Sequence, residues 1–123
     1  RENVGLIAYS PLAFGQLSGK YIDNPKTRGR MTLFTSDWMM HYRRPAVLDA
    51  TRRYVELARD NGMTPAQLSL AWCYSRWFID ATVIGATQMS HLQENIDAID
   101  ISLSDEIVDH INGIHASITN PAL

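Results

Sequence analysis

Two segments of the chain carry small, hydroxylated and aromatic residues suited to holding an anionic ligand. The first is Tyr-Ser-Pro-Leu-Ala-Phe-Gly at residues 9–15, and the second is Gly-Ala-Thr at residues 85–87, followed by Glu94 and Asn95. Each segment directly follows a short apolar run that is typical of a buried strand. Glycine and small side chains let a backbone approach an anion closely. On one edge of a parallel sheet, two such loops would form a cradle for a cofactor.

The aromatic residue of the first segment has the more specific position. Tyr9 stands at the carboxyl end of its predicted strand, where side chains of a parallel barrel face the ligand-binding mouth. Ser10 can offer its hydroxyl and its backbone N–H to an anion, while Leu12, Phe14 and Gly15 would form an apolar wall. A tyrosine buried in a core is the alternative for Tyr9.

The basic residues near the first segment allow phosphate binding but match no standard nucleotide motif. Three residues separate Gly15 from Gly19, whereas a P-loop has four, and Tyr21 stands where a P-loop has serine or threonine. The dinucleotide pattern G-x-G-x-x-G is also absent. One loop arginine could still bind a cofactor phosphate through its planar guanidinium. A solvated helix face and a mobile loop explain the arginine series better than nucleic-acid binding does: Arg28, Arg30, Arg43, Arg44, Arg52 and Arg53.

No metal site and no nucleophilic triad are assigned. The four histidines lack metal-ligand spacing, and His110 and His115 are five residues apart, which places them on different faces of a helix. The single cysteine, Cys73, has no partner for an internal disulfide, which favours a reducing, cytoplasmic location. We expect Cys73 to be buried and inert, with a reactive thiol as the alternative.

Composition indicates one ordinary globular domain, taken as residues 1–123. The chain is 46% hydrophobic and 20% charged, and no apolar run approaches the roughly 18 residues of a membrane span. The net charge of −2 is uneven: residues 1–62 carry ten Lys/Arg and six Asp/Glu, whereas residues 63–123 carry one and seven. The basic half could face an anionic ligand, but the whole chain is too acidic for general nucleic-acid affinity. We therefore expect neither nucleic acid nor a membrane as a partner.

The pattern of the chain predicts two strands among several helices. We expect strands at residues 4–9 and 81–84, and a loop over residues 23–44. Helices are expected at 45–61, at 65–75 after the capping box Thr64–Gln67, from a second capping box at Ser90–Gln93, and from Ser104 onward.

Strands joined by helical crossovers pair in parallel, so the expected class is α/β. A (β/α)8 barrel needs about 250 residues. This chain supplies roughly the last quarter of the strands of such a barrel. It begins at Arg1, and an apolar strand starts within three residues of Arg1. We therefore expect part of a longer barrel protein, incomplete as given.

Several separated motifs resemble the aldo-keto reductase superfamily, most closely its Tas-like and potassium channel β-subunit-like branch. The resemblance covers nearly all of the chain and corresponds to the C-terminal part of the barrel, with strands seven and eight. The motifs are Tyr9-Ser10-Pro11-Leu12, Gly19-Lys20-Tyr21, Arg30, and Gly85 through Glu94-Asn95.

The resemblance implies a (β/α)8 barrel that binds NADPH and reduces aldehydes or ketones. It implies that Tyr9 stacks on the nicotinamide ring and that Arg30 reaches the adenosine phosphate end. Glu94 and Asn95 would bind the adenine amino group. The residues implied at the pyrophosphate and ribose are Ser10, Leu12, Gly15, Ser18 and Lys20. Those implied near the 2′-phosphate are Gly85, Ala86, Thr87 and His91.

Two positions depart from the family pattern and leave the choice of cofactor open. Many members have a basic residue where Gly85 stands, and arginine or glutamine where His91 stands. NADPH is the expected cofactor and NADH the less favoured alternative, because Lys20 and Arg30 can supply positive charge.

The catalytic Asp, Tyr, Lys and His of the superfamily lie on earlier strands, so no catalytic residue is carried over. We expect this chain alone not to turn over a carbonyl substrate. One alternative is a non-catalytic protein that senses nicotinamide cofactor, and another is a helical interaction domain that binds none. An intact upstream Asp/Tyr/Lys/His set would favour the enzyme. The sequence leaves the substrate and the oligomeric state open.

Overall fold

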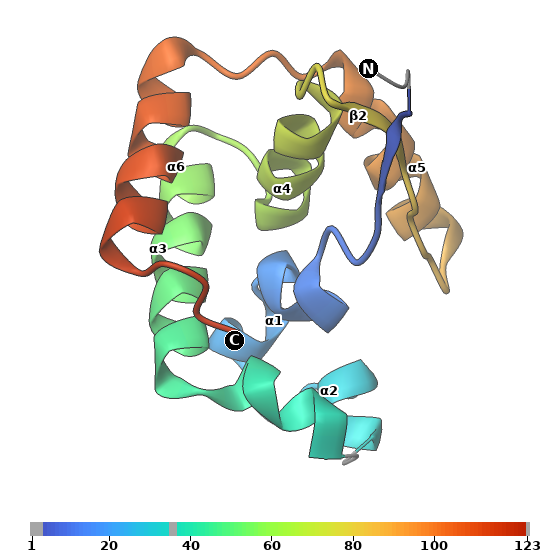
Figure 1. The fold of residues 1–123 in the computed structure, drawn as a ribbon. Coiled ribbons are helices and arrows are strands. Elements are labelled where there is room, and N and C mark those ends of the chain that lie inside the picture. Colours follow the sequence, from blue (N-terminus) through green and yellow to red (C-terminus); the bar gives the residue numbers. More distant parts are fainter. Residues whose placement is uncertain (1–3, 35–36, 123) are drawn as a thin grey trace.

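A computed structural model describes residues 4–34 and 37–122, which form several helices and a small two-stranded sheet at one side of the molecule (Figure 1). The strands are β1 (Leu6–Ala8) and β2 (Ile79–Thr82). The described helices, α-helical or 3₁₀ (η), are η1 (Ala13–Ser18), α1 (Lys20–Asp23), α2 (Arg30–Leu33), η2 (Asp37–Arg43), α3 (Pro45–Asp60), α4 (Pro65–Tyr74), α5 (Met89–Asp97), η3 (Ala98–Asp100) and α6 (Asp105–Ser117).

The two strands pair in parallel, as the sequence predicts. Leu6 lies opposite Ile79 and Ala8 opposite Thr82, and the N–H of Val83 donates to the Ala8 carbonyl at 2.8 Å. β1 is shorter than predicted, whereas β2 has the predicted length but begins and ends two residues earlier than the apolar run suggests. Asp80 lies in β2, and its carboxylate lies against Gly5, where any Cβ would collide with it.

The apolar strand residues are exposed, contrary to the expectation of strands covered on both faces. Val4 is 83% exposed, and Leu6, Ile7 and Val83 are also exposed. A two-stranded sheet leaves both edges open and has too few neighbours to cover its faces.

The two long central helices are confirmed, together with their caps. Thr64 Oγ1 accepts from the Gln67 N–H at 3.1 Å, and Gln67 Oε1 accepts from the Thr64 N–H at 2.9 Å. Gly62, between α3 and α4, has the left-handed φ of +70° that favours glycine. The cap of α6 is also confirmed, since Ser104 Oγ accepts from the Ile107 N–H at 3.3 Å.

The main core lies where α3, α4 and α6 meet. α6 packs against α3, and α3 packs against α4 (Figure 1). Apolar residues of these three helices supply the core, whose buried members are Leu57, Ala58, Leu68, Ile107 and Ile111. None of the described helices is long and apolar enough to cross a membrane.

The predicted second capping box is wrong. α5 begins at Met89 with Gln88 at the cap position, and no side chain caps it. Because the helix starts one residue before Ser90, that residue lies inside the first turn rather than at the cap.

The predicted loop over residues 23–44 is also wrong in part, because it contains α2 and η2. A second small core forms there from Tyr21, Met31 and Met39, all buried. Tyr21 Oη accepts from the Met31 N–H at 3.1 Å, so α2 is fixed to α1. Turns this short contain too few residues to show a helical period.

Candidate cofactor-binding site

The two ligand-binding segments named from the sequence leave the sheet at the same edge. Parallel pairing puts the carboxyl ends of β1 and β2 together, and Figure 1 shows both following segments running to the same side of the sheet. Tyr9, at the end of β1, is 79% exposed. Gly85, Ala86 and Thr87, after β2, are exposed as well.

The turn after β1 holds three non-glycine residues in left-handed backbone conformations. The φ angles are +54° at Ser10, +46° at Ala13 and +57° at Phe14, followed by +91° at Gly15. Hydrogen bonds from the Ala13 N–H to the Ser10 carbonyl and from the Gly15 N–H to the Leu12 carbonyl, both 2.8 Å, close the turn. Such conformations cost on the order of 1–3 kcal/mol each and cluster at binding sites. This strain is the strongest local sign of function, and the sequence gives no signal for it.

The Lys20 side chain lies between Gly15 and Gly29, which are far apart in sequence. A Cβ at Gly15 would lie 3.3 Å from Lys20 Cε, and a Cβ at Gly29 would lie 2.7 Å from Lys20 Nζ. The ammonium also lies 5.0 Å from the centre of the Tyr21 ring. Ser18 Oγ donates to the Gly15 carbonyl at 2.8 Å and holds the end of the turn. The glycines therefore provide the space for a cation beside the strained turn.

Arg30 extends the positive charge from α2 onto the same turn. Its guanidinium carbon lies 5.2 Å from the centre of the Phe14 ring, and Phe14 contacts Tyr42 with ring centres 5.0 Å apart. Gln16 Nε2 donates to the Tyr42 carbonyl at 3.0 Å, which ties η2 to η1. Burial, and secondarily the nearby Tyr9, raise the pKa of the Tyr42 hydroxyl.

The α5 residues form a second group, beside the turn after β2. Asn95 is 3% exposed, and its Nδ2 donates to the Gly85 carbonyl at 3.4 Å. Its own carbonyl accepts from Tyr74 Oη at 3.0 Å. Glu94 Oε1 accepts from Thr64 Oγ1 at 2.5 Å. His91 is exposed on the same helix.

The predicted site residues fall into two groups, one beside each of the turns that follow the two strands. One group surrounds η1, and the other joins α5 to the turn after β2. The first group consists of Tyr9, Ser10, Leu12, Gly15, Ser18, Lys20 and Arg30, and the second of Gly85, Ala86, Thr87, His91, Glu94 and Asn95.

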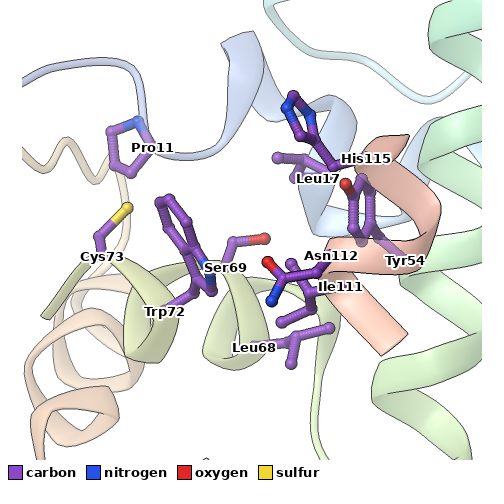
Figure 2. A pocket seen from close by; sticks show the side chains of 10 residues that line it. All are labelled: Pro11, Leu17, Tyr54, Leu68, Ser69, Trp72, Cys73, Ile111, Asn112 and His115. Carbon is purple, nitrogen blue, oxygen red and sulfur yellow. The ribbon is translucent and has the colours of Figure 1, made fainter. Parts of the chain in front are cut away.

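A separate cavity of about 330 Å³, which the sequence did not reveal, opens between α4, α6 and the turn after β1 (Figure 2). Its wall is mainly apolar, and Pro11 and Leu17 are the residues that it shares with that turn. The other lining residues are Tyr54, Leu68, Ser69, Trp72, Cys73, Ile111, Asn112 and His115. Within the described residues, no group of three or more His, Cys, Asp or Glu side chains could hold a metal ion.

The buried thiol of Cys73 should react slowly with alkylating reagents. Burial raises the pKa of Cys73, which lowers the fraction of reactive thiolate at neutral pH. We expect iodoacetamide labelling to be slower than for free cysteine, with a rate profile displaced to higher pH. Labelling in urea is the control, and an equal rate in the folded and unfolded protein would contradict the burial.

A family model for the aldo/keto reductase family matches residues 1–116. The chain belongs to this family. Aldo-keto reductases are oxidoreductases that fold as (β/α)8 barrels and usually bind a nicotinamide cofactor. The two-stranded parallel sheet and its helices agree with an α/β segment of such a fold.

Curated aldo-keto reductase relatives match almost the whole chain. Protein tas of Escherichia coli is 38% identical over 122 residues, which is 98% of this chain and 35% of that protein. A putative voltage-gated potassium channel subunit beta of Schizosaccharomyces pombe is 33% identical, covering 89% of this chain and 33% of that protein. The L-glyceraldehyde 3-phosphate reductase of Escherichia coli is 30% identical, over 80% and 29% respectively. The chain therefore spans about a third of the length of these relatives.

Proposed function

We propose that residues 1–123 are the C-terminal, cofactor-binding part of an NADP(H)-dependent aldo-keto reductase that reduces aldehydes or ketones in the cytoplasm. In this proposal β1 and β2 are strands seven and eight of the barrel. The catalytic tetrad lies elsewhere in the protein, so these residues bind and orient the cofactor rather than catalyse. Family membership and the reductase among the relatives support an oxidoreductase.

The observation that carries the proposal is the strained turn at the carboxyl end of β1. Ser10, Ala13 and Phe14 hold left-handed backbone conformations that L-residues rarely adopt, and Lys20 lies beside them in a seat left by Gly15 and Gly29. Strained backbone conformations persist only where the surrounding structure holds them, and they cluster at binding and active sites. A fixed turn with adjacent positive charge suits a phosphate-bearing ligand.

The residues present fit the cofactor in charge and in shape. Lys20 and Arg30 supply the positive charge that phosphates require. Tyr9 offers an exposed aromatic face for stacking, and the open space around Gly85 admits a bulky group. Bound NADPH would supply the hydride, and the chain's own work would be positioning. We assign the nicotinamide ring to Tyr9 and the adenosine end to Arg30 and the second group. The remaining residues of the first group are assigned to the pyrophosphate and ribose.

We propose NADPH rather than NADH as the cofactor. The charge on Lys20 and Arg30 favours the ligand with the additional phosphate, while Gly85 and His91 supply less charge than the corresponding residues of many members. The preference should therefore appear as a ratio of affinities rather than as exclusion of NADH.

Titration of the full-length protein tests the proposal. NADPH should enhance nicotinamide fluorescence saturably and bind more tightly than NADH. Tyr9→Ala should weaken NADPH binding, because it removes the aromatic ring on which the nicotinamide would stack. The Tyr9 ring is exposed, so its loss should disturb the fold little. Trp77→Ala is the matched control, since Trp77 is also an exposed aromatic but precedes β2, at the opposite edge of the sheet. Equal losses in both variants, or no saturable binding by the wild type, would contradict the proposal.

The potassium channel subunit beta relative favours a second candidate function. In this alternative the protein binds nicotinamide cofactor as a regulatory or sensing subunit without turnover. Cofactor binding is common to both candidates, so the distinguishing measurement is carbonyl-dependent oxidation of bound NADPH. Turnover by the full-length protein supports the reductase, and binding without turnover across a panel of aldehydes and ketones supports the regulatory protein.

A further inference from the structure

We propose that Thr64 is a positioning residue for the cofactor site, because its hydroxyl fixes the carboxylate of Glu94. The inference rests on the proposed function, in which Glu94 binds the adenine amino group. It adds that the cap of α4 and the adenine end of the site form one hydrogen-bonded unit. Neither the capping box nor the family resemblance requires such a connection.

The direction of the hydrogen bonds at Thr64 is determined by its chemistry. Thr64 Oγ1 accepts from the Gln67 N–H at 3.1 Å and lies 2.5 Å from Glu94 Oε1. A hydroxyl has a single hydrogen to donate, and a carboxylate can only accept. The Thr64 proton therefore points at Glu94, and the bond has the short length of a hydrogen bond to a charged oxygen.

The capping box prevents Thr64 from turning away. Gln67 Oε1 accepts from the Thr64 N–H at 2.9 Å, so backbone and side chain are both held at the start of α4. The other end of α4 holds the neighbour of Glu94, because Tyr74 Oη donates to the Asn95 carbonyl at 3.0 Å. The pair Glu94–Asn95 is thus held by groups near both ends of one buried helix.

A held carboxylate binds more tightly than a mobile one. Ordering a free glutamate side chain on binding costs rotamer entropy. The hydrogen bond to Thr64 already orders Glu94 in part, so less entropy is lost when the ligand binds. A carboxylate has about four acceptor sites on its two oxygens, so Glu94 retains capacity for an amino group of the ligand.

The test compares two pieces of the cofactor in the full-length protein, by calorimetric titration. The adenine-containing probe is 2′,5′-ADP, and the probe without adenine is reduced nicotinamide mononucleotide. Thr64→Val keeps the shape but removes the donor, and it should weaken 2′,5′-ADP about tenfold, because Glu94 must then be ordered when the ligand binds. The mononucleotide affinity should not change. Thr64→Ser keeps the hydroxyl and should bind 2′,5′-ADP like the wild type.

A double-mutant cycle separates the positioning role from loss of the helix cap. In a Glu94→Ala background, Thr64→Val should have no further effect on 2′,5′-ADP, because no carboxylate remains to be positioned. Loss of the cap would instead act equally in both backgrounds and on both probes. A tenfold loss that persists in the Glu94→Ala background, or that is shared by the mononucleotide, overturns the inference.

The remaining outcomes are also decisive. Wild-type affinity for 2′,5′-ADP in Thr64→Val overturns the positioning role and leaves the proposed function standing. Failure of the wild type to bind NADPH and both probes overturns the proposed function, and this inference with it.

Discussion

Lys20→Met should weaken NADPH binding by about 10- to 100-fold, the range for one lost hydrogen bond to a charged partner. Methionine is similarly long and unbranched but carries no charge. The effect should be large because the Lys20 side chain is already held in place, with Gly15 on one side and Gly29 on the other. A cation held in place loses less freedom on binding than one on a mobile side chain. The affinity is measured by nicotinamide fluorescence at two salt concentrations.

Lys26→Met is the matched control for Lys20→Met. Lys26 has the same charge and lies six residues away, but it is exposed in the connection between α1 and α2. We expect it to change NADPH affinity by less than about threefold, since exposed charges contribute little. Salt should weaken NADPH binding to the wild type more than to Lys20→Met. Equal losses for the two lysines would show that general surface charge, rather than a specific seat, attracts the cofactor.

Leu70→Ala should destabilise the folded protein by about 2–5 kcal/mol, the range for removing a buried leucine and leaving a cavity. Leu70 is fully buried, at 0% exposure, in the middle of α4. That helix packs against α3, α5, β2, η1 and η3, so few neighbours are free to move into the space. Urea denaturation followed by far-ultraviolet circular dichroism gives the change in the free energy of unfolding.

Leu33→Ala is the comparison for Leu70→Ala. Leu33 ends α2 and is 55% exposed, so we expect a change within about 0.5 kcal/mol. A Leu70→Ala protein that unfolds at the same urea concentration as Leu33→Ala would mean that α4 is not central to stability.

The long helices could be predicted because their signals are local. Thr64, Pro65 and Gln67 define the start of α4 within four residues, and the buried residues of α3 recur over about three turns. Ser104 with its acidic neighbours marks the start of α6 in the same way. Such signals depend only on neighbouring residues, so the sequence contains them in full.

The segment between α1 and α3 could not be predicted, because its stability comes from distant contacts. Tyr21 accepts from the Met31 N–H, and the Arg43 side chain donates to the Met31 carbonyl. Gln16 reaches the Tyr42 carbonyl across 26 positions. Each of these contacts depends on how the segment folds back, which neither periodicity nor composition specifies.

The candidate site divides in the same way. Its residue types were visible in sequence, from Tyr9 to Asn95, and so was the expectation of a common edge. The left-handed turn was not visible, because Ser10, Ala13 and Phe14 do not favour positive φ. The position of Lys20 between Gly15 and Gly29 was not visible in the sequence either, because these glycines contact the lysine only after the chain has folded. The Thr64–Glu94 bond joins positions 30 residues apart and was hidden for the same reason.

The contact between Gly5 and Asp80 lies beside the point where the pairing of the two strands changes register, between Leu6 and Ile7. A side chain at position 5 would occupy the place of the Asp80 carboxylate, so glycine at this position leaves room for Asp80 beside β1. Sliding one strand by a single residue would offset the two ligand-facing turns by about 3.3 Å and reverse the faces of every side chain on that strand. Gly5, well outside the binding turns, thereby favours the strand pairing that places the two turns side by side.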